Sequence, residues 1–130
     1  MSLFQTNFSL KNYNTFGIDA KAKYFVSFDS IYKLKQILSS EVYQKNKHFV
    51  LGGGSNILLT KNFDGLIIHN KIGGIYILED NSDYILVEVG AGVNWHDFVI
   101  WSVGQKLSGI ENLALRLFTF LYAVRSEHCF

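Results

Sequence analysis

A run of three glycines followed by two small polar residues is the strongest chemical signal in the sequence. It lies in HFVLGGGSNILL (48–59), between two apolar segments. The run comprises Gly52, Gly53, Gly54, Ser55 and Asn56. Glycine weakens a strand, so three at the end of one usually serve a purpose. Their backbone N–H groups can approach an anion closely, and the serine and asparagine side chains add donors. The segment predicts a pyrophosphate-binding loop or, alternatively, a flexible turn that binds nothing.

A second strand end is also built of small residues. Gly90, Ala91 and Gly92 follow an apolar stretch and would leave room for a flat ring or for another backbone. Neither glycine segment has the Gly-Lys-Ser/Thr of a Walker loop or the GxGxxG of a dinucleotide fingerprint. If phosphate binds here, the fold is therefore expected to differ from a Rossmann domain.

The remaining reactive residue types do not form a catalytic or metal-binding pattern. The four histidines, at positions 48, 69, 96 and 128, lack metal-ligand spacing and are expected at the surface or partly packed. No serine has an evident His/Asp partnership, and Cys129 has no neighbouring cations to activate its thiol. No catalytic residue and no metal ligand is therefore assigned.

Composition limits the class of protein. The chain has 130 residues, 48% hydrophobic and 18% charged, which suits one globular domain with a modest core. A net charge of +1 favours neither nucleic acid nor an anionic membrane as a partner. No apolar run approaches the roughly 18 residues of a membrane helix, and no signal peptide is apparent. A single cysteine excludes an internal disulfide. A cytoplasmic location is expected.

The first half of the chain has a β-α-β-loop-β pattern. Residues 1–17 are expected to be an irregular arm that ends in a tight turn at Gly17. Strands are expected at 22–28, 49–51 and 65–69, the last a continuously apolar run typical of a buried strand. Apolar residues at helical spacing predict one helix from a cap at Asp29-Ser30 to about residue 44. This order favours a parallel or mixed sheet with a helix packed on it.

After Gly73-Gly74 the pattern changes. Residues 75–78 and 84–89 predict an antiparallel hairpin around a polar turn. A helix is expected to begin at Asn94, with Asp97 completing a capping box, and to stop at Gly104. The change in composition near Gly73 suggests two lobes.

Several segments, in order, resemble the UDP-N-acetylenolpyruvoylglucosamine reductase (MurB) family. These are NTFG (14–17), LGGGSNILL (51–59), GLIIHN (65–70), VGAGVNWHDF (89–98) and GIENLAL (109–115). The order and spacing match as well as the residues, over roughly residues 10–115. Flavin oxidases of the vanillyl-alcohol-oxidase type share a glycine-rich loop and a GAG strand end, but they do not usually share NTFG together with NWH and GxENLA.

The resemblance implies an α+β, FAD-binding fold of the PCMH/vanillyl-alcohol-oxidase type. The expected domains are an arm and complete first lobe (1–70), an incomplete second lobe (71–115) and a tail that departs from the family (116–130). The family enzyme passes hydride from NADPH through FAD to UDP-N-acetylglucosamine enolpyruvate, a step of peptidoglycan synthesis.

The resemblance also implies roles for individual residues. Residues 52–56 would cradle the FAD pyrophosphate, and residues 90–92 would lie near the flavin. Asn14, Thr15 and Gly17 would belong to an arm that closes over the first lobe, and Asn94, Trp95 and His96 would be structural. Glu111 and Asn112 would lie where the chain turns back toward the flavin.

The tail RLFTFLYAVRSEHCF (116–130) lacks the glycines and proline that the family has there. A frameshift or truncation is one explanation, and a genuine short protein is the other. The tail is expected either to pack as a helix or strand over an exposed lobe face or to promote aggregation. Because the family's catalytic residues lie downstream, the 130 residues alone are expected not to turn over substrate. The alternatives are a monomeric, weakly FAD- or ADP-binding module and a non-functional fragment.

Overall fold

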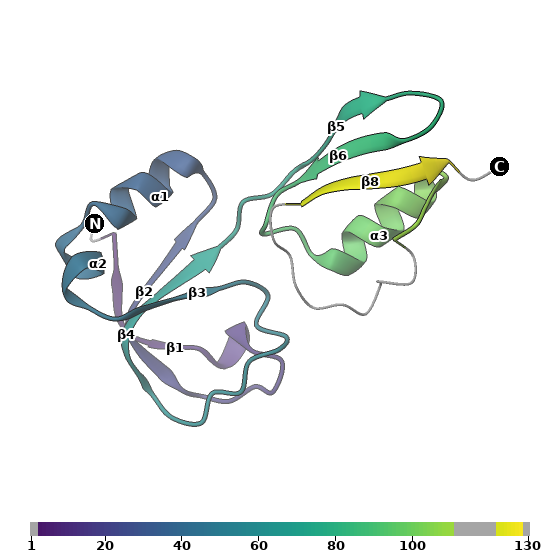
Figure 1. The fold of residues 1–130 in the computed structure, drawn as a ribbon. Coiled ribbons are helices and arrows are strands. Elements are labelled where there is room, and N and C mark those ends of the chain that lie inside the picture. The colour runs from purple at the N-terminus through teal and green to yellow at the C-terminus, as the bar shows by residue number, and fades with distance from the viewer. Residues whose placement is uncertain (1–2, 111–121, 129–130) are drawn as a thin grey trace. The chain divides into compact units, whose positions relative to one another are not determined.

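The chain forms two compact units, Met1–Lys71 and Ile72–Phe130, each with its own sheet and core. The computed structural model describes residues 3–110 and 122–128, drawn in colour in Figure 1. Among these residues no helix is both long and apolar enough to cross a membrane.

The first unit is built on a mixed four-stranded sheet. Its strands, in spatial order, are β1 (Gln5–Ser9), β2 (Lys21–Phe28), β4 (Phe63–Asn70) and β3 (His48–Leu51). β2, β4 and β3 run parallel, and β1 pairs antiparallel with β2. Residues 65–68 form the buried middle of β4, His69 is half-buried, and the expected mixed sheet is confirmed. A continuous buried run of this kind is typical of a parallel strand whose two faces are both covered.

The expectation of an irregular arm at residues 1–17 was wrong. Residues 5–9 form β1, and Lys11–Tyr13 form a 3-10 turn, η1. β1 is an edge strand with mostly exposed side chains, so its sequence carries no apolar alternation. Its pairing with β2, a long-range interaction, decides its conformation. The expected turn at Gly17 is confirmed, because Gly17 has a φ of 63° and its N–H donates to the Asn14 carbonyl at 3.1 Å.

The single helix expected up to residue 44 is broken in two. α1 (Ile31–Leu38) lies alongside β2, and α2 (Glu41–Lys45) follows after two serines. The Ser40 hydroxyl accepts from the Tyr43 N–H at 3.2 Å and donates to the Ile37 carbonyl at 2.6 Å. Ser40 is thus the N-cap of α2, and its hydroxyl also hydrogen-bonds a carbonyl in the last turn of α1. Apolar periodicity continues across the break and therefore does not reveal it.

An aromatic cluster forms the core on one face of the first sheet. Phe25 stacks on Phe8 with ring centroids 4.0 Å apart and meets the Tyr13 ring edge-on at 4.9 Å. The same core includes Leu10, Ala22, Phe25, Leu51 and Ile67. A bulge between Ala22 and Tyr24 shifts the alternation of β2, so Ala22 and Phe25 reach the same cluster.

The second unit contains a four-stranded sheet and one long helix. Its elements are β5 (Ile75–Asp80), β6 (Ile85–Val89), α3 (Trp95–Gly104), β7 (Leu107–Ser108) and β8 (Tyr122–His128). The antiparallel pairing of β5 with β6 confirms the expected hairpin. The sheet order is β5-β6-β8-β7. Part of the tail thus joins the sheet as a strand between β6 and β7, instead of covering a face.

Helix α3 begins and ends where the sequence predicts, although its caps differ in detail. The Asn94 side chain accepts from the His96 N–H at 2.8 Å, so Asn94 is the N-cap, but its bond goes to His96 and not to Asp97 as a capping box requires. Gly104 is the last helical residue. The left-handed residue that usually ends a helix is Lys106, with a φ of 59°.

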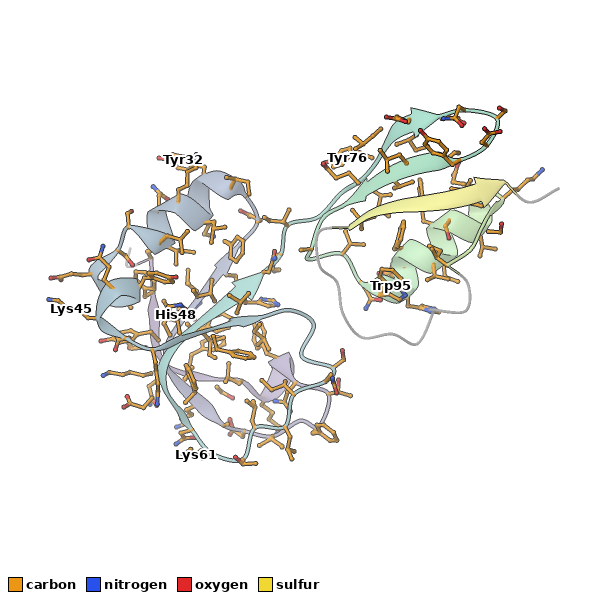
Figure 2. All side chains as sticks on the ribbon, in the orientation of Figure 1. Tyr32, Lys45, His48, Lys61, Tyr76 and Trp95 are labelled. Atoms are coloured by element: carbon orange, nitrogen blue, oxygen red, sulfur yellow. The ribbon has the colours of Figure 1, made fainter. Side chains whose placement is uncertain are left out.

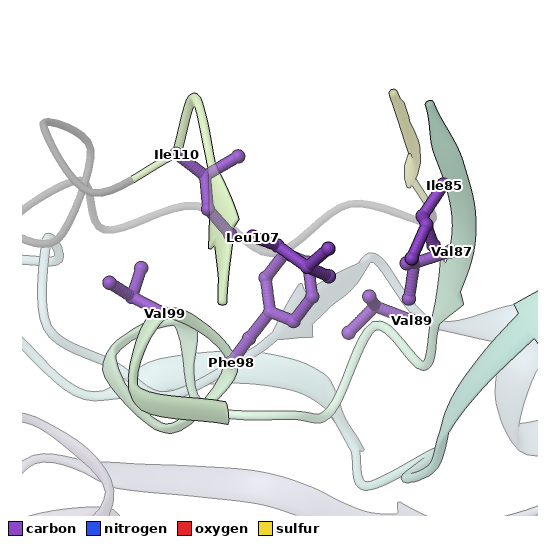
Figure 3. Packing of buried hydrophobic residues seen from close by; sticks show 7 residues of the cluster. All are labelled: Ile85, Val87, Val89, Phe98, Val99, Leu107 and Ile110. Atoms are coloured by element: carbon purple, nitrogen blue, oxygen red, sulfur yellow. The ribbon is translucent and has the colours of Figure 1, made fainter. Parts of the chain in front are cut away.

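The core of the second unit lies between β6 and α3. Figure 3 shows Ile85, Val87 and Val89 of β6 on one side and Phe98 and Val99 of α3 on the other, with Leu107 and Ile110 completing the cluster. Phe98 also contacts the rings of Trp95 and Trp101. The alternate β6 residues that face the helix are buried, whereas Glu88 is exposed. This period-two pattern explains why the hairpin was readable from the sequence.

Phe25→Ala should lower the free energy of unfolding of the first unit by about 3–5 kcal/mol, because the change opens a cavity beneath Phe8 and Tyr13. Phe16→Ala is the matched control, since Phe16 is 64% exposed and should change stability by less than about 0.5 kcal/mol. Urea unfolding measures both. Equal effects of the two variants would contradict the assigned core.

Candidate functional site

The glycine segment lies where β3 ends. β3 and β4 are parallel neighbours, so the chain leaves the carboxyl end of β3 and has to return along the sheet before β4 begins. Residues 52–62 make this return without a helix. Ile57, Leu59 and Phe63 pack against the aromatic core on the way. The carboxyl end of a parallel strand is the usual place for a ligand-binding loop in such sheets.

Gly54 is held by the backbone of the N-terminal segment. Its φ is 67°, and a Cβ added there would lie 2.8 Å from the carbonyl carbon of Tyr13 and closer still to its oxygen. The Gly54 carbonyl accepts from the Thr15 N–H at 3.1 Å. Both the conformation and the contact exclude a side chain. Gly54 is therefore glycine in order to hold the loop in place.

Gly52 and Gly53 have different surroundings. Both are exposed, and a Cβ on either would meet no described protein atom within 4 Å. Ser55 is half-buried and Asn56 is exposed, so a hydroxyl and an amide lie beside the two open glycines. These residues form the open lip of the loop. An anion could approach the lip closely and meet uncharged hydrogen-bond donors there. Of the five predicted residues, Gly54 thus holds the loop in place, and the other four are at least partly exposed.

The residues of the NTFG segment lie between η1 and β2. Asn14 is buried, Thr15 contacts Gly54 through its N–H, and Gly17 closes the turn. Tyr13 was not singled out from the sequence. Its carbonyl lies against Gly54, and its ring contacts Phe8, Phe25 and His69. An aromatic residue directly before NTFG was the only available signal.

His69 lies beside the start of the glycine loop. It pairs with Leu51 across β4 and β3, and its Nδ1 hydrogen-bonds with the Ser27 hydroxyl at 3.1 Å. The Tyr13 ring meets the imidazole edge-on at 5.0 Å. Burial, aided by the positive charge of Lys71, lowers the pKa of His69 from its ordinary value of 6.5. His69 is thus a partly packed histidine, as expected, and it favours the neutral form.

The second predicted strand end is tied to the segment that enters its unit. The Gly90 N–H donates to the Gly74 carbonyl at 2.9 Å, and the Gly92 N–H donates to the Ile72 carbonyl at 2.7 Å. A Cβ on Gly90 would lie 2.5 Å from the carbonyl oxygens of Gly73 and Ile72. Close backbone packing therefore accounts for Gly90. Ala91 is half-buried and Gly92 is exposed.

A cleft of about 430 Å³ lies elsewhere in the first unit, at the amino ends of β2 and β4. Its lining residues are Thr6, Asn7, Lys21, Ala22, Lys23, Tyr24, Asn62, Phe63 and Asp64. None of the predicted site residues lines this cleft, which faces the opposite edge of the parallel strands. The glycine loop is exposed and would bind a ligand through backbone N–H groups. The depth of a cleft is therefore a poor guide to its position. Across residues 3–110 and 122–128, no three His, Cys, Asp or Glu side chains gather as a metal site would require.

Comparison with known families identifies the domain. The family described as FAD binding domain matches residues 22–119, most of the chain. The chain belongs to this family. The match includes both predicted glycine segments and confirms, at the level of the family, the expected FAD cofactor. Glu111 and Asn112 lie outside the described residues.

The relatives of this FAD-binding domain are reductases. The UDP-N-acetylenolpyruvoylglucosamine reductase of Flavobacterium johnsoniae is 50% identical over 111 residues, which are 85% of this chain and 32% of that protein. The reductase of the same name from Amoebophilus asiaticus is 44% identical over 111 residues, 85% of this chain and 33% of that protein. The chain spans about a third of the length of these relatives. The predicted resemblance is thereby confirmed.

A solved structure shows the same fold. The crystal structure of UDP-N-acetylenolpyruvylglucosamine reductase (MurB) from Thermus caldophilus matches with a TM-score of 0.61 and 24% identity. The match covers 86% of this chain and 38% of that one. The expected FAD-binding α+β fold is confirmed.

Gly54→Ala should destabilise the first unit by about 2 kcal/mol or more, because a methyl group would collide with the Tyr13 carbonyl and a positive φ is strained for alanine. Gly53→Ala should leave stability within about 0.5 kcal/mol of the parent. Thermal unfolding of the two variants checks this difference. A Gly53→Ala penalty equal to that of Gly54→Ala would contradict the division of the loop.

Acid should destabilise the first unit through His69. The folded state disfavours the imidazolium, so the unfolded chain binds more protons and stability falls as the pH drops from about 6.5 toward the lowered pKa. His69→Asn should remove this part of the pH dependence. Urea unfolding of parent and variant between pH 8 and pH 5 measures the difference. Parallel pH profiles would show that His69 does not contribute.

Proposed function

We propose that this chain is the FAD-binding part of a UDP-N-acetylenolpyruvoylglucosamine reductase and that residues 52–56 bind the pyrophosphate of FAD. The observation that carries the proposal is the open lip at Gly52 and Gly53, held from behind at Gly54, in a chain of the FAD-binding family. The 50% identity to a named reductase supports the activity of the longer protein.

The described residues suit a pyrophosphate. Such a group carries negative charge over several oxygens and is bound well by backbone N–H groups that a side chain would otherwise screen. Gly52 and Gly53 have free space on the side where a Cβ would stand. The Ser55 hydroxyl and the Asn56 amide can donate to the same oxygens. Binding by neutral donors also agrees with the low net charge of the chain.

The second glycine segment has a narrower part in the proposal. Gly90 is accounted for by packing against residues 72 and 73, so we assign the cofactor contact to Ala91 and Gly92. The methyl group of Ala91 and the absence of a side chain at Gly92 would allow a planar ring to come close. This assignment is supported by the resemblance alone.

The proposed reaction of the longer protein reduces UDP-N-acetylglucosamine enolpyruvate to UDP-N-acetylmuramate with NADPH as donor. FAD supplies the hydride-carrying chemistry when it is bound. The contribution proposed for the described residues is to bind and orient FAD, and none of them is assigned to the reduction. The UDP-sugar substrate follows the relatives' names. The NADPH donor, the role in peptidoglycan synthesis and the cytoplasmic location are proposed from the family resemblance.

Gly53→Asp should weaken FAD binding at least about tenfold, because a carboxylate at the lip would repel the pyrophosphate at short range. Since Gly53 faces open space, the variant should fold normally. Gly104→Asp, at an equally open and exposed position in the second unit, is the matched control and should keep the parent affinity. Quenching of FAD fluorescence measures binding. Unchanged affinity of Gly53→Asp would overturn the proposed pyrophosphate loop.

A further inference from the structure

Asn14 is a buried polar residue whose side chain is fully used. Its Nδ2 donates to the Leu10 carbonyl at 2.7 Å and to the Ile18 carbonyl at 2.9 Å, and its Oδ1 accepts from the Ile18 N–H at 3.0 Å. One amide thus ties together both ends of the segment 10–18. Because the Leu10 carbonyl is buried and the groups of Ile18 are half-buried, the loss of the amide would leave backbone groups poorly partnered.

The segment that Asn14 ties touches the glycine loop through backbone atoms. The Tyr13 carbonyl, directly before Asn14, lies against the Cα of Gly54. The Thr15 N–H, directly after Asn14, donates to the Gly54 carbonyl at 3.1 Å. The two groups that hold Gly54 therefore flank Asn14 in the sequence. Neither is a side chain, so their positions depend on how the backbone of the segment is fixed.

We propose that Asn14 is a positioning residue for the glycine loop, setting the conformation of residues 52–56 through the flanking Tyr13 carbonyl and Thr15 N–H. The inference rests on the proposed binding of the FAD pyrophosphate to that loop. Asn14 itself touches no cofactor in this assignment. Its effect on affinity is indirect, since a loop that is already in its binding conformation pays less entropy when the ligand arrives.

The chain offers a substitution that disrupts the Thr15 contact directly and leaves the Asn14 side chain unchanged. Asn14 to Gly17 form a turn closed by the Gly17 N–H, and neither Thr15 nor Phe16 has a positive φ. Thr15 thus occupies the second position of the turn, which proline favours. Asn14 has a φ of −144° and a ψ of 144°, as a residue before proline prefers. Thr15→Pro should keep the turn and replace the N–H with the ring Cδ, which would stand against the Gly54 carbonyl. Thr15→Ala keeps both the turn and the N–H.

The experiment compares FAD affinity and the backbone amide resonances of residues 52–56 in the ligand-free protein. Thr15→Pro and Asn14→Ala should each weaken FAD binding about tenfold or more and shift these resonances. Thr15→Ala should do neither. Ile37→Ala, which removes a fully buried side chain from α1, should lower the melting temperature and leave both readouts unchanged. This control separates positioning from a general loss of stability.

Affinity within twofold of the parent for Thr15→Pro and Asn14→Ala would overturn the inference. If Asn14→Ala does not fold, Thr15→Pro decides, because it leaves all three Asn14 bonds in place. If the parent chain does not bind FAD, the proposed function fails. The inference is then judged on the ligand-free resonances, and a loop spectrum unchanged by Thr15→Pro would overturn it.

Discussion

The contact between Gly54 and the backbone on either side of Asn14 ties the glycine loop to the N-terminal segment of the first unit. The Tyr13 carbonyl lies against Gly54, and the Thr15 N–H donates to its carbonyl. The two preceding glycines remain exposed. The segment that makes this contact follows β1, which is held in place by its pairing with β2. The Tyr13 ring also packs against Phe25, which anchors η1 to the core.

The two glycine-rich strand ends look alike in the sequence but differ physically. In the first, one glycine is needed for the fold and its neighbours are open to a ligand. In the second, Gly90 is packed against carbonyls, and the N–H groups of Gly90 and Gly92 already bind the chain at residues 72–74. Small residues at a strand end thus serve close backbone packing in one case and access in the other. A function assigned to such a segment has to be assigned residue by residue.

The cleft and the glycine loop lie at opposite ends of the parallel strands of the first unit. The two lysines that line the cleft, Lys21 and Lys23, stand at the amino end of β2. Lys45, His48 and Lys61, which Figure 2 labels in the same unit, do not line the cleft. The proposed cofactor loop follows the carboxyl end of β3. In the proposal, an anion would be bound there mainly by hydrogen bonds from backbone N–H groups and small polar side chains.

The sequence alone determined the features that depend on local patterns or on short motifs shared with a family. The buried run of β4, the hairpin of β5 and β6, the cap at Asn94, the turn at Gly17 and the glycine loop were all predicted because periodicity, capping and glycine content are local properties. The break at Ser40 is also local, since a side-chain cap makes it, but continuous apolar spacing hides it. Only the tertiary structure decided the rest. β1 has no local strand signal and exists through its pairing with β2, and the hold of Tyr13 and Thr15 on Gly54 joins segments about forty residues apart. Such long-range contacts leave no periodic trace in the sequence, because the groups that make them are backbone atoms common to every residue.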